Sequence, residues 1–231
     1  MGQHEALNST AYRHIKNMIL NNDLEFNVIY SETKIAAELK ISRTPIRDAL
    51  VRLSQEHYID VIPSKGFMLH KPNAEDLVQA RHFRLAIECY CASQIASAPH
   101  TPESLHTIAE MERMLKLQYS VADSEHLKDF WQLDVQFHLL LVSQLHNTYF
   151  DSLYANCNYL FSSLSVTSFF TENRHLSTLE EHREVIRTLK KGSPQEAARA
   201  VASHIEESTN IILQDMEKSA VLFGAVLYTS V

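Results

Sequence analysis

Apolar positions recur at helical spacing in two short, adjacent stretches of the chain, residues 31–40 and 41–53. The first stretch begins at Ser31 and the second at Ser42, and serine is a residue type that favours helix N-caps. Pro45 lies in the first turn of the second stretch, where its missing amide donor costs little. The apolar stripes are Ile35, Ala36 and Leu39 on the first stretch and Ile46, Ala49, Leu50 and Leu53 on the second. The pattern predicts two short helices joined by a tight turn.

After these helices the pattern changes from helical spacing to that of strands. Residues 58–62 are β-branched and aromatic, residues 63–66 read Pro-Ser-Lys-Gly and are typical of a turn, and residues 67–69 are apolar again. This predicts a two-stranded hairpin with a basic tip. A helix, a tight turn, a helix and a hairpin make a winged helix-turn-helix, whose second helix enters the major groove of DNA.

The rest of the apolar pattern is almost entirely helical. A helix is predicted at 9–22, and Lys71-Pro72-Asn73 breaks the chain after the hairpin. Beyond this break the predicted helices are 74–98, 102–119, 123–145, 147–168, 176–191 and 194–215. We therefore predict a mainly α protein, with an N-terminal winged helix-turn-helix at 1–72 followed by an antiparallel all-α helical bundle at 73–231. The apolar segment 220–231 fits a strand, a packed tail or an interface.

Charge is distributed unevenly between the two predicted domains. The chain has a formal net charge of −7, from 21 Lys and Arg and 28 Asp and Glu; residues 1–70 contain 8 of each class, which leaves 13 basic and 20 acidic residues beyond them. A neutral first part with its arginines on one helix favours site-directed DNA binding over nonspecific attraction. The 3 cysteines form no Cys-x-x-Cys pair, and no apolar run is long enough to span a bilayer. We expect a cytoplasmic protein with no membrane partner.

The exposed side of the helix at 41–53 carries the chemistry needed to bind DNA. Guanidinium and hydroxyl groups can meet phosphates and guanine edges, although a basic face that is simply solvated is the alternative. The candidate DNA-binding residues on this helix are Ser42, Arg43, Thr44, Pro45, Arg47 and Arg52. The hairpin tip adds Lys65 and Gly66.

Residues 12–69 resemble the DNA-binding domain of GntR-family bacterial transcription regulators. The residues that carry the resemblance are Ser31-Glu32, Ser42–Leu50 and Pro63-x-Lys65-Gly66. Lys40 stands where the family usually has Gly in the turn, and Thr33 stands where many members carry a DNA-contacting Arg, with Lys34 as a substitute. The resemblance implies a homodimer that binds a two-fold operator in double-stranded DNA.

Four potential metal ligands lie on the apolar sides of three predicted bundle helices. Asp134 and His138 are four residues apart and therefore project from one helix face, while His182 and His204 lie on the apolar stripes of the last two predicted helices. Taken alone, each histidine is better explained as a hydrogen-bonded core residue than as a metal ligand, because such core histidines are commoner. However, burying the carboxylate without a cation would carry a large desolvation cost. The set predicts a divalent transition metal, Zn²⁺ first, with Ni²⁺, Mn²⁺ or Fe²⁺ as alternatives.

The bundle also resembles the FadR C-terminal domain, called FCD, that follows the DNA-binding domain in one GntR subfamily. The matching residues are Arg84–Glu88, Asp134-x-x-Phe137-His138, Asn147, His182 and His204. The resemblance implies that a small carboxylate effector completes the coordination of the metal in a central pocket. Arg84 and Asn147 are the candidate effector-binding residues, and an ion pair with Glu88 one turn away is the alternative role of Arg84.

Three functional classes are consistent with these features. The leading one is a transcriptional repressor whose operator binding responds to a small organic acid. A metalloenzyme tethered to DNA is the second, although the sequence offers no evident general base other than the metal ligands. The third is a regulator whose metal is purely structural, which predicts a large loss of melting temperature on chelation and no response to acids.

Overall fold

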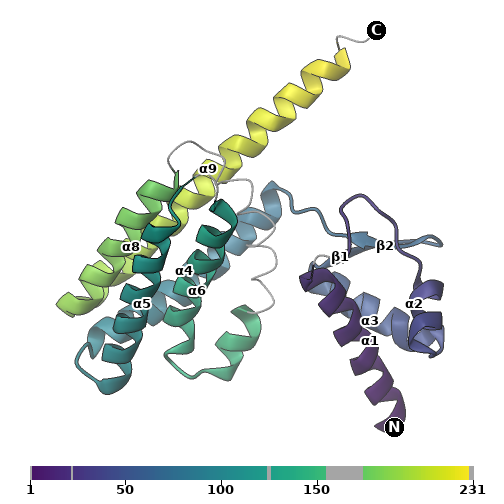
Figure 1. Cartoon of the computed structure of the whole chain (residues 1–231), viewed down its shortest axis with the longest axis horizontal. Coiled ribbons are helices and arrows are strands. Elements are labelled where there is room, and N and C mark those ends of the chain that lie inside the picture. The colour runs from purple at the N-terminus through teal and green to yellow at the C-terminus, as the bar shows by residue number, and fades with distance from the viewer. Residues whose placement is uncertain (1, 22, 124–125, 155–173, 229–231) are drawn as a thin grey trace. The chain divides into compact units, whose positions relative to one another are not determined.

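In the computed structural model the chain forms two units, Met1–Pro72 and Asn73–Val231 (Figure 1). The structure describes residues 2–21, 23–123, 126–154 and 174–228. The first unit contains helices α1 (Gly2–Leu20), α2 (Glu32–Leu39) and α3 (Arg43–Gln55) and strands β1 (Ile59–Ile62) and β2 (Gly66–Leu69). The second contains α4 (Ala74–Ser97), α5 (Pro102–Ser120), α6 (Leu127–Ser143), α8 (Arg174–Lys191) and α9 (Pro194–Tyr228), with residues 148–154 also helical. The predicted mainly α fold is confirmed.

The first unit is held together by apolar residues from every one of its elements. Its fully buried side chains include Ile15 of α1, Ile46 and Leu53 of α3, and Phe67 of β2. The two strands pair antiparallel, with Ile59 opposite Leu69 and Ile62 opposite Gly66. The hairpin therefore packs on the helices through its buried positions, as a wing does in a winged helix-turn-helix.

Two backbone positions shape this first unit. Lys40 ends α2 in the left-handed region, with φ 55° and ψ 39°, where glycine would be less strained. Gly66 has φ 137°, and a Cβ atom there would lie 2.0 Å from the carbonyl oxygen of Tyr30. The wing thus requires glycine at its second strand, because both the backbone conformation and the neighbouring chain exclude a side chain.

Helix boundaries differ from the predicted ones where local hydrogen bonds decide them. Helix α1 begins at Gly2 rather than at residue 9, and α6 begins at Leu127 rather than at residue 123, with the Asp123 carboxylate accepting a hydrogen bond from the amide of His126 just before the helix. Helix α9 continues to Tyr228, so the backbone of the undecided segment is helical as far as that residue. Of the predicted helix 147–168, residues 155–168 lie outside the described part of the chain.

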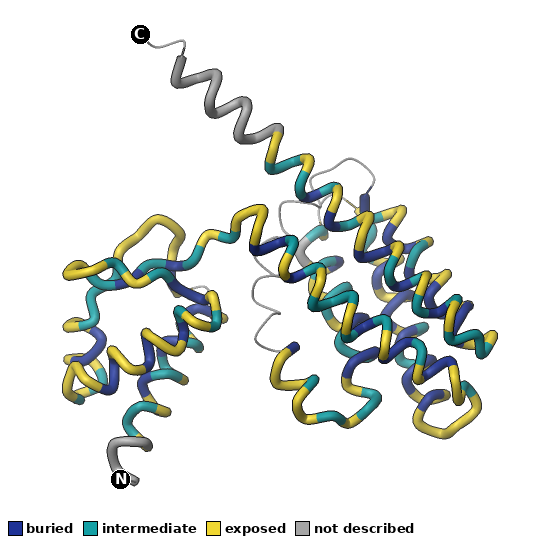
Figure 2. Tube along the Cα trace, turned by 180° about the vertical axis from the view of Figure 1, so that it is seen from behind, coloured by how far each residue is buried: buried dark blue, intermediate teal, exposed yellow. Residues whose placement is uncertain are grey.

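The second unit is a helical bundle with one large apolar core. Buried positions lie on the inward sides of its helices, and exposed positions lie on their outer sides (Figure 2). The fully buried residues of this core include Ala92, Ile95, Met111, Phe130, Phe137, Leu141, Leu189 and Ile205. Asn73 begins α4 with a capping box, in which its side chain and that of Asp76 each accept a backbone amide of the other residue. Among the described residues, none of the helices is both long and apolar enough to cross a bilayer.

Candidate functional site

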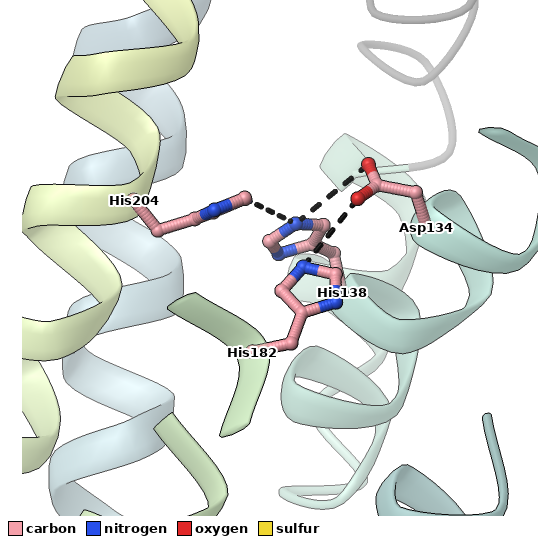
Figure 3. A group of neighbouring side chains, drawn as sticks. All are labelled: Asp134, His138, His182 and His204. Carbon is pink, nitrogen blue, oxygen red and sulfur yellow. Dashed lines mark hydrogen bonds and ion pairs between the residues drawn. The ribbon is translucent and has the colours of Figure 1, made fainter. Parts of the chain in front are cut away.

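The four predicted metal ligands lie together inside the bundle. Asp134 and His138 project from α6, His182 from α8 and His204 from α9, and one potential ligand atom of each lies within 4.8 Å of those of the others. The three imidazoles and the carboxylate point toward one another (Figure 3). The Nε2 atoms of His138 and His204 are 3.0 Å apart, and Asp134 lies 3.4 Å from Nε2 of His182 and 3.9 Å from Nε2 of His138.

The other nitrogen of each imidazole contacts a fixed acceptor. Nδ1 of His138 lies 2.7 Å from Glu88, Nδ1 of His204 lies 2.6 Å from Glu181, and Nδ1 of His182 lies 2.9 Å from the side-chain oxygen of Gln118. Ionised carboxylates and amide oxygens only accept hydrogen bonds, so each Nδ1 must donate. A neutral ring that donates through Nδ1 carries its lone pair on Nε2, which is the arrangement used by metal-binding histidines.

This tautomer makes the centre of the cluster electron-rich. Two imidazole lone pairs face each other across 3.0 Å, and Nε2 of His182 is buried without a hydrogen-bond partner. The contact of that atom with Asp134 meets the distance for an ion pair but not the geometry of a hydrogen bond. A buried acceptor without a donor costs free energy, and a cation among the four side chains would remove that cost. The residues therefore fit a divalent metal.

Burial and buried charges set the protonation of these groups. The histidines are between 0% and 3% exposed. Burial lowers the pKa of His182 well below its ordinary value, and burial also lowers the pKa of His204 although Glu181 opposes this. Burial alone would raise the pKa of Glu181, but His204 and Arg174 together lower it to about 2. These shifts keep the rings of His182 and His204 neutral and the carboxylate of Glu181 ionised at pH 7.

Packing fixes the ring planes as well as the nitrogen atoms. The ring of Phe137, which is fully buried, stacks on that of His182 with centroids 3.8 Å apart and an angle of 4° between the planes. Phe137 precedes His138 on α6, where its ring lies edge-on to that of His138 with centroids 5.7 Å apart. One aromatic side chain therefore restricts two of the histidines, so little ordering of side chains is left for ligand binding.

The two candidate effector residues already have partners within the chain. Arg84 donates to Glu88 through Nε at 2.6 Å and through Nη2 at 3.4 Å, so the ion pair that the sequence offered as an alternative is formed. The carboxylate of Glu88 also accepts a hydrogen bond from the hydroxyl of Tyr154 at 2.8 Å. The oxygen of Asn147 accepts amide hydrogen bonds from residues 149 and 150, which makes Asn147 the N-cap of the helical residues 148–154.

Sequence reasoning did not identify the residues that orient the histidines. Glu181 stands next to His182 in the chain but supports His204, and Gln118 comes from a helix with no ligand of its own. Arg174, at the start of α8, is buried and donates to both oxygens of Glu181, at 2.6 and 2.7 Å. The only local signal in the sequence was that Glu181 precedes His182. That adjacency would have paired Glu181 with His182, whereas Glu181 contacts His204.

A groove in the first unit collects half of the predicted DNA-binding residues. It has a volume of about 580 Å³ and lies between α2, α3 and the hairpin. The predicted residues that line it are Thr33, Arg43, Arg47, Lys65 and Gly66, and Ser31, Glu32 and Ser64 line it with them. Arg43 and Arg47 of α3 and the tip of the hairpin therefore share one concave surface.

The arginines in this groove are both held by one acidic side chain. Glu32 accepts hydrogen bonds from Arg47 through Nη2 at 2.9 Å and through Nε at 3.1 Å, and it also forms an ion pair with Arg43. These contacts, with Arg47 first, lower the pKa of Glu32 to about 2. The carboxylate thus stays charged and keeps the Arg47 guanidinium in one orientation.

Other predicted DNA-binding residues lie elsewhere in the first unit. Pro45 is buried in the packed face of α3, which corrects the expectation that it contacts DNA. Arg52 pairs with Glu56 at 2.9 Å, and its guanidinium lies 3.9 Å from the ring centroid of Tyr12, so it is held toward α1. Thr44, Lys34 and Ser42 are exposed but do not line the groove. Both Ser31 and Ser42 occupy N-cap positions, but neither side chain makes a capping hydrogen bond, contrary to expectation.

Comparison with known proteins connects both units to described families. Residues 7–69 match the family described as bacterial regulatory proteins, gntR family, and residues 79–207 match the FCD domain. The HTH-type transcriptional repressor RspR of Escherichia coli is 22% identical over 95% of this chain and 95% of its own. The gluconate operon transcriptional repressor of Bacillus licheniformis is 25% identical over 65% of this chain and 60% of its own.

Solved structures share the fold at low identity. A putative GntR regulator from Rhodococcus sp. RHA1 superposes with a TM-score of 0.68 and 20% identity, over 90% of this chain and 97% of its own. McbR/YncC of E. coli gives a TM-score of 0.65 at 18% identity, over 90% and 97%. These likenesses establish the arrangement of the elements.

Proposed function

The chain belongs to the GntR family of bacterial transcription regulators and carries an FCD domain, and from this premise we propose that it is a repressor controlled by a small organic acid. Residues 1–72 bind the operator, and residues 73–231 bind a divalent metal and the acid. The observation that carries the proposal is the convergence of three imidazole Nε2 atoms and one carboxylate inside the bundle. The regulator acts in the cytoplasm as a homodimer on a two-fold operator.

The proposed ligands of the metal are Asp134, His138, His182 and His204. Three nitrogens and one oxygen suit Zn²⁺, and also Ni²⁺, Mn²⁺ or Fe²⁺. When bound, the metal supplies a positive charge and an open coordination position to which a carboxylate can bind. Glu88, Gln118 and Glu181 would hold the histidine tautomers so that each Nε2 lone pair is available to the metal.

The effector is proposed to bind at this centre, with Arg84 and Asn147 as its further contacts. Because Arg84 is paired with Glu88 in the described structure, binding to Arg84 requires the guanidinium to share its donors with the incoming carboxylate. The Glu88 carboxylate would keep its contacts with His138 and Tyr154 during that change. An effector would thereby act on the same network that supports a metal ligand, which supplies the differential contacts that a switch needs.

Operator binding is proposed to use the groove of the first unit. Arg43, Thr44 and Arg47 contact base edges and phosphates, and Lys65 and Gly66 contact the neighbouring backbone from the wing. Exposed Thr33 and Lys34 lie on α2, where they can reach phosphates. The matched family and the curated relatives are transcription regulators, which removes support from the metalloenzyme alternative.

The test combines metal content with operator binding on the same preparations. An operator is first selected from random duplexes, and binding is then measured for wild type, His182→Ala and the control His106→Ala, an exposed histidine of α5. We expect about one metal ion per wild-type or control chain and less for His182→Ala, with similar operator affinity for all three. A panel of small organic acids should alter operator binding only for the two metal-loaded proteins.

Two results would overturn the proposal in different ways. A wild-type protein that takes up no divalent metal on titration would remove the metal site. A metal that raises the melting temperature while no acid alters operator binding would show a purely structural ion, an alternative that the burial of the histidines favours.

A further inference from the structure

A chain of hydrogen bonds links one buried arginine to the metal-facing histidine of α9. Arg174 is 4% exposed and stands at the first position of α8. Its two Nη atoms donate to the two oxygens of Glu181, and the Oε2 atom of Glu181 lies 2.6 Å from Nδ1 of His204. The fork between guanidinium and carboxylate fixes the carboxylate plane as well as its position.

The same guanidinium also joins α8 to α9 directly. Nη2 of Arg174 donates to the hydroxyl of Ser208 at 2.6 Å, and Nη1 donates to that of Ser177 at 2.7 Å. Ser208 lies one helical turn beyond His204 on α9. Two contacts one turn apart therefore fix how α9 presents His204 to the centre of the bundle.

We propose that Arg174 is the positioning residue for His204, holding Glu181 so that the imidazole keeps its proton on Nδ1 and presents a free Nε2 lone pair to the metal. The proposal rests on the proposed metal site. Without Arg174, the Glu181 side chain, already 23% exposed, can turn to solvent. Nδ1 of His204 then has no fixed acceptor.

Loss of that acceptor has a specific chemical consequence. His204 can shift its proton from Nδ1 to Nε2 and donate it to Nε2 of His138, which is 3.0 Å away. This hydrogen bond joins the two nitrogens that the metal needs, so metal binding must first break it. Arg174 thus acts by disfavouring the hydrogen bond between His204 and His138, which would compete with metal binding.

Arg84, which is partly buried, also pairs with a carboxylate that contacts a histidine of the cluster. Arg84 donates to Glu88, which contacts His138, and both Arg84 and Glu88 belong to α4. His182 is supported by the neutral Gln118. The bonds of Arg174 connect the two helices that carry His182 and His204.

The experiment compares Zn²⁺ affinity, by chelator competition on the full-length protein, for wild type, Arg174→Ala, Arg174→Lys and Ser208→Ala. The control is Arg183→Ala, since Arg183 is an exposed residue of the same helix that pairs with Glu180 at 2.6 Å. We expect Arg174→Ala to raise the Zn²⁺ dissociation constant about 10- to 100-fold, with a smaller rise for Arg174→Lys and no change in the control. If Arg174→Ala does not fold, Arg174→Lys and Ser208→Ala decide the outcome.

A merely structural arginine would give a different result. The melting temperature of the metal-free protein would fall, while the Zn²⁺ dissociation constant and the absorption spectrum of the Co²⁺-loaded protein would match those of wild type, and this would overturn the proposal. Two results distinguish failure of the metal site from failure of the positioning role. If wild type binds no Zn²⁺ in the competition assay, the metal site itself is refuted. If ¹⁵N NMR on metal-free protein shows that His204 keeps its proton on Nδ1 in every Arg174 variant, the positioning role of Arg174 is refuted.

Discussion

Replacing Glu32 by Gln should make the groove between α2, α3 and the hairpin bind DNA more tightly and discriminate less between operator and other sequences. Glu32 binds the guanidinium of Arg47 through two donors and also pairs with Arg43, so one negative charge lies between two positive ones. Glutamine has nearly the same shape, but it cannot neutralise either arginine. The two side chains are more than half exposed and would be free to reach any nearby phosphate.

The magnitude follows from counterion release. If the substitution frees about one further phosphate contact, the slope of log affinity against log salt should steepen by about 0.9. Between 200 and 50 mM salt this corresponds to a gain of about 3.5-fold beyond that of wild type on nonspecific duplex. Operator binding should gain less, because Arg47 loses the acceptor that orients it, so the ratio of operator to nonspecific affinity should fall, by up to about 3.5-fold at 50 mM salt relative to 200 mM.

The assay is fluorescence anisotropy on operator and scrambled duplexes across a salt series. The matched control is Glu38→Gln, which makes the same change of charge at an exposed position of the same helix that does not line the groove. Equal salt slopes and equal affinity ratios for Glu32→Gln and Glu38→Gln would refute the reasoning, because Glu32 would then contribute only its charge.

Other predictions concern the same two units. Arg47→Ala should weaken operator binding about tenfold to a hundredfold and relax the preference at one base pair, which single-base operator variants would reveal. Lys65→Ala should weaken every duplex alike and reduce the salt slope by about 0.9, whereas a loss confined to one operator base would contradict a backbone contact. Zn²⁺ at about 100 times its dissociation constant should stabilise the protein by about 2.7 kcal/mol, or about 5–11 °C in calorimetry, and His182→Ala should abolish that shift. Because the pKa of Glu181 is lowered from 4.5 to about 2, its contribution to stability is complete above pH 4.5 and lost as the pH falls toward 2, so denaturant melts of Glu181→Gln should lack that part of the acid dependence.

The sequence was sufficient to predict the helices and strands in outline and to predict which side chains cluster as candidate metal ligands. Helical periodicity reports which face of a helix is buried, so the sequence alone assigns Asp134 and the three histidines to inward faces. The turn residues located the wing, because a Pro-Ser-Lys-Gly segment between two apolar runs is typical of a hairpin turn.

The supporting contacts could not be predicted, since they depend on the rotation of one helix against another. Gln118 and Arg174 look like ordinary polar residues in the sequence, and only the packing of α5, α8 and α9 shows that their side chains are used inside the bundle. Local hydrogen bonding likewise decides the ends of helices. Ser42 has the residue type and the extended backbone of an N-cap, yet its hydroxyl makes no capping bond.

The wing of the first unit is attached to more than its own hairpin partner. Tyr30 exchanges two backbone hydrogen bonds with Phe67, at 2.7 and 3.0 Å, so the segment before α2 pairs with β2 through one antiparallel bridge. The absence of a Cβ atom at Gly66 is what allows that close approach. A wing already ordered in the free protein loses little conformational entropy on meeting DNA. Its contribution to binding should therefore appear in a slow dissociation rate, with no ordering step to delay association.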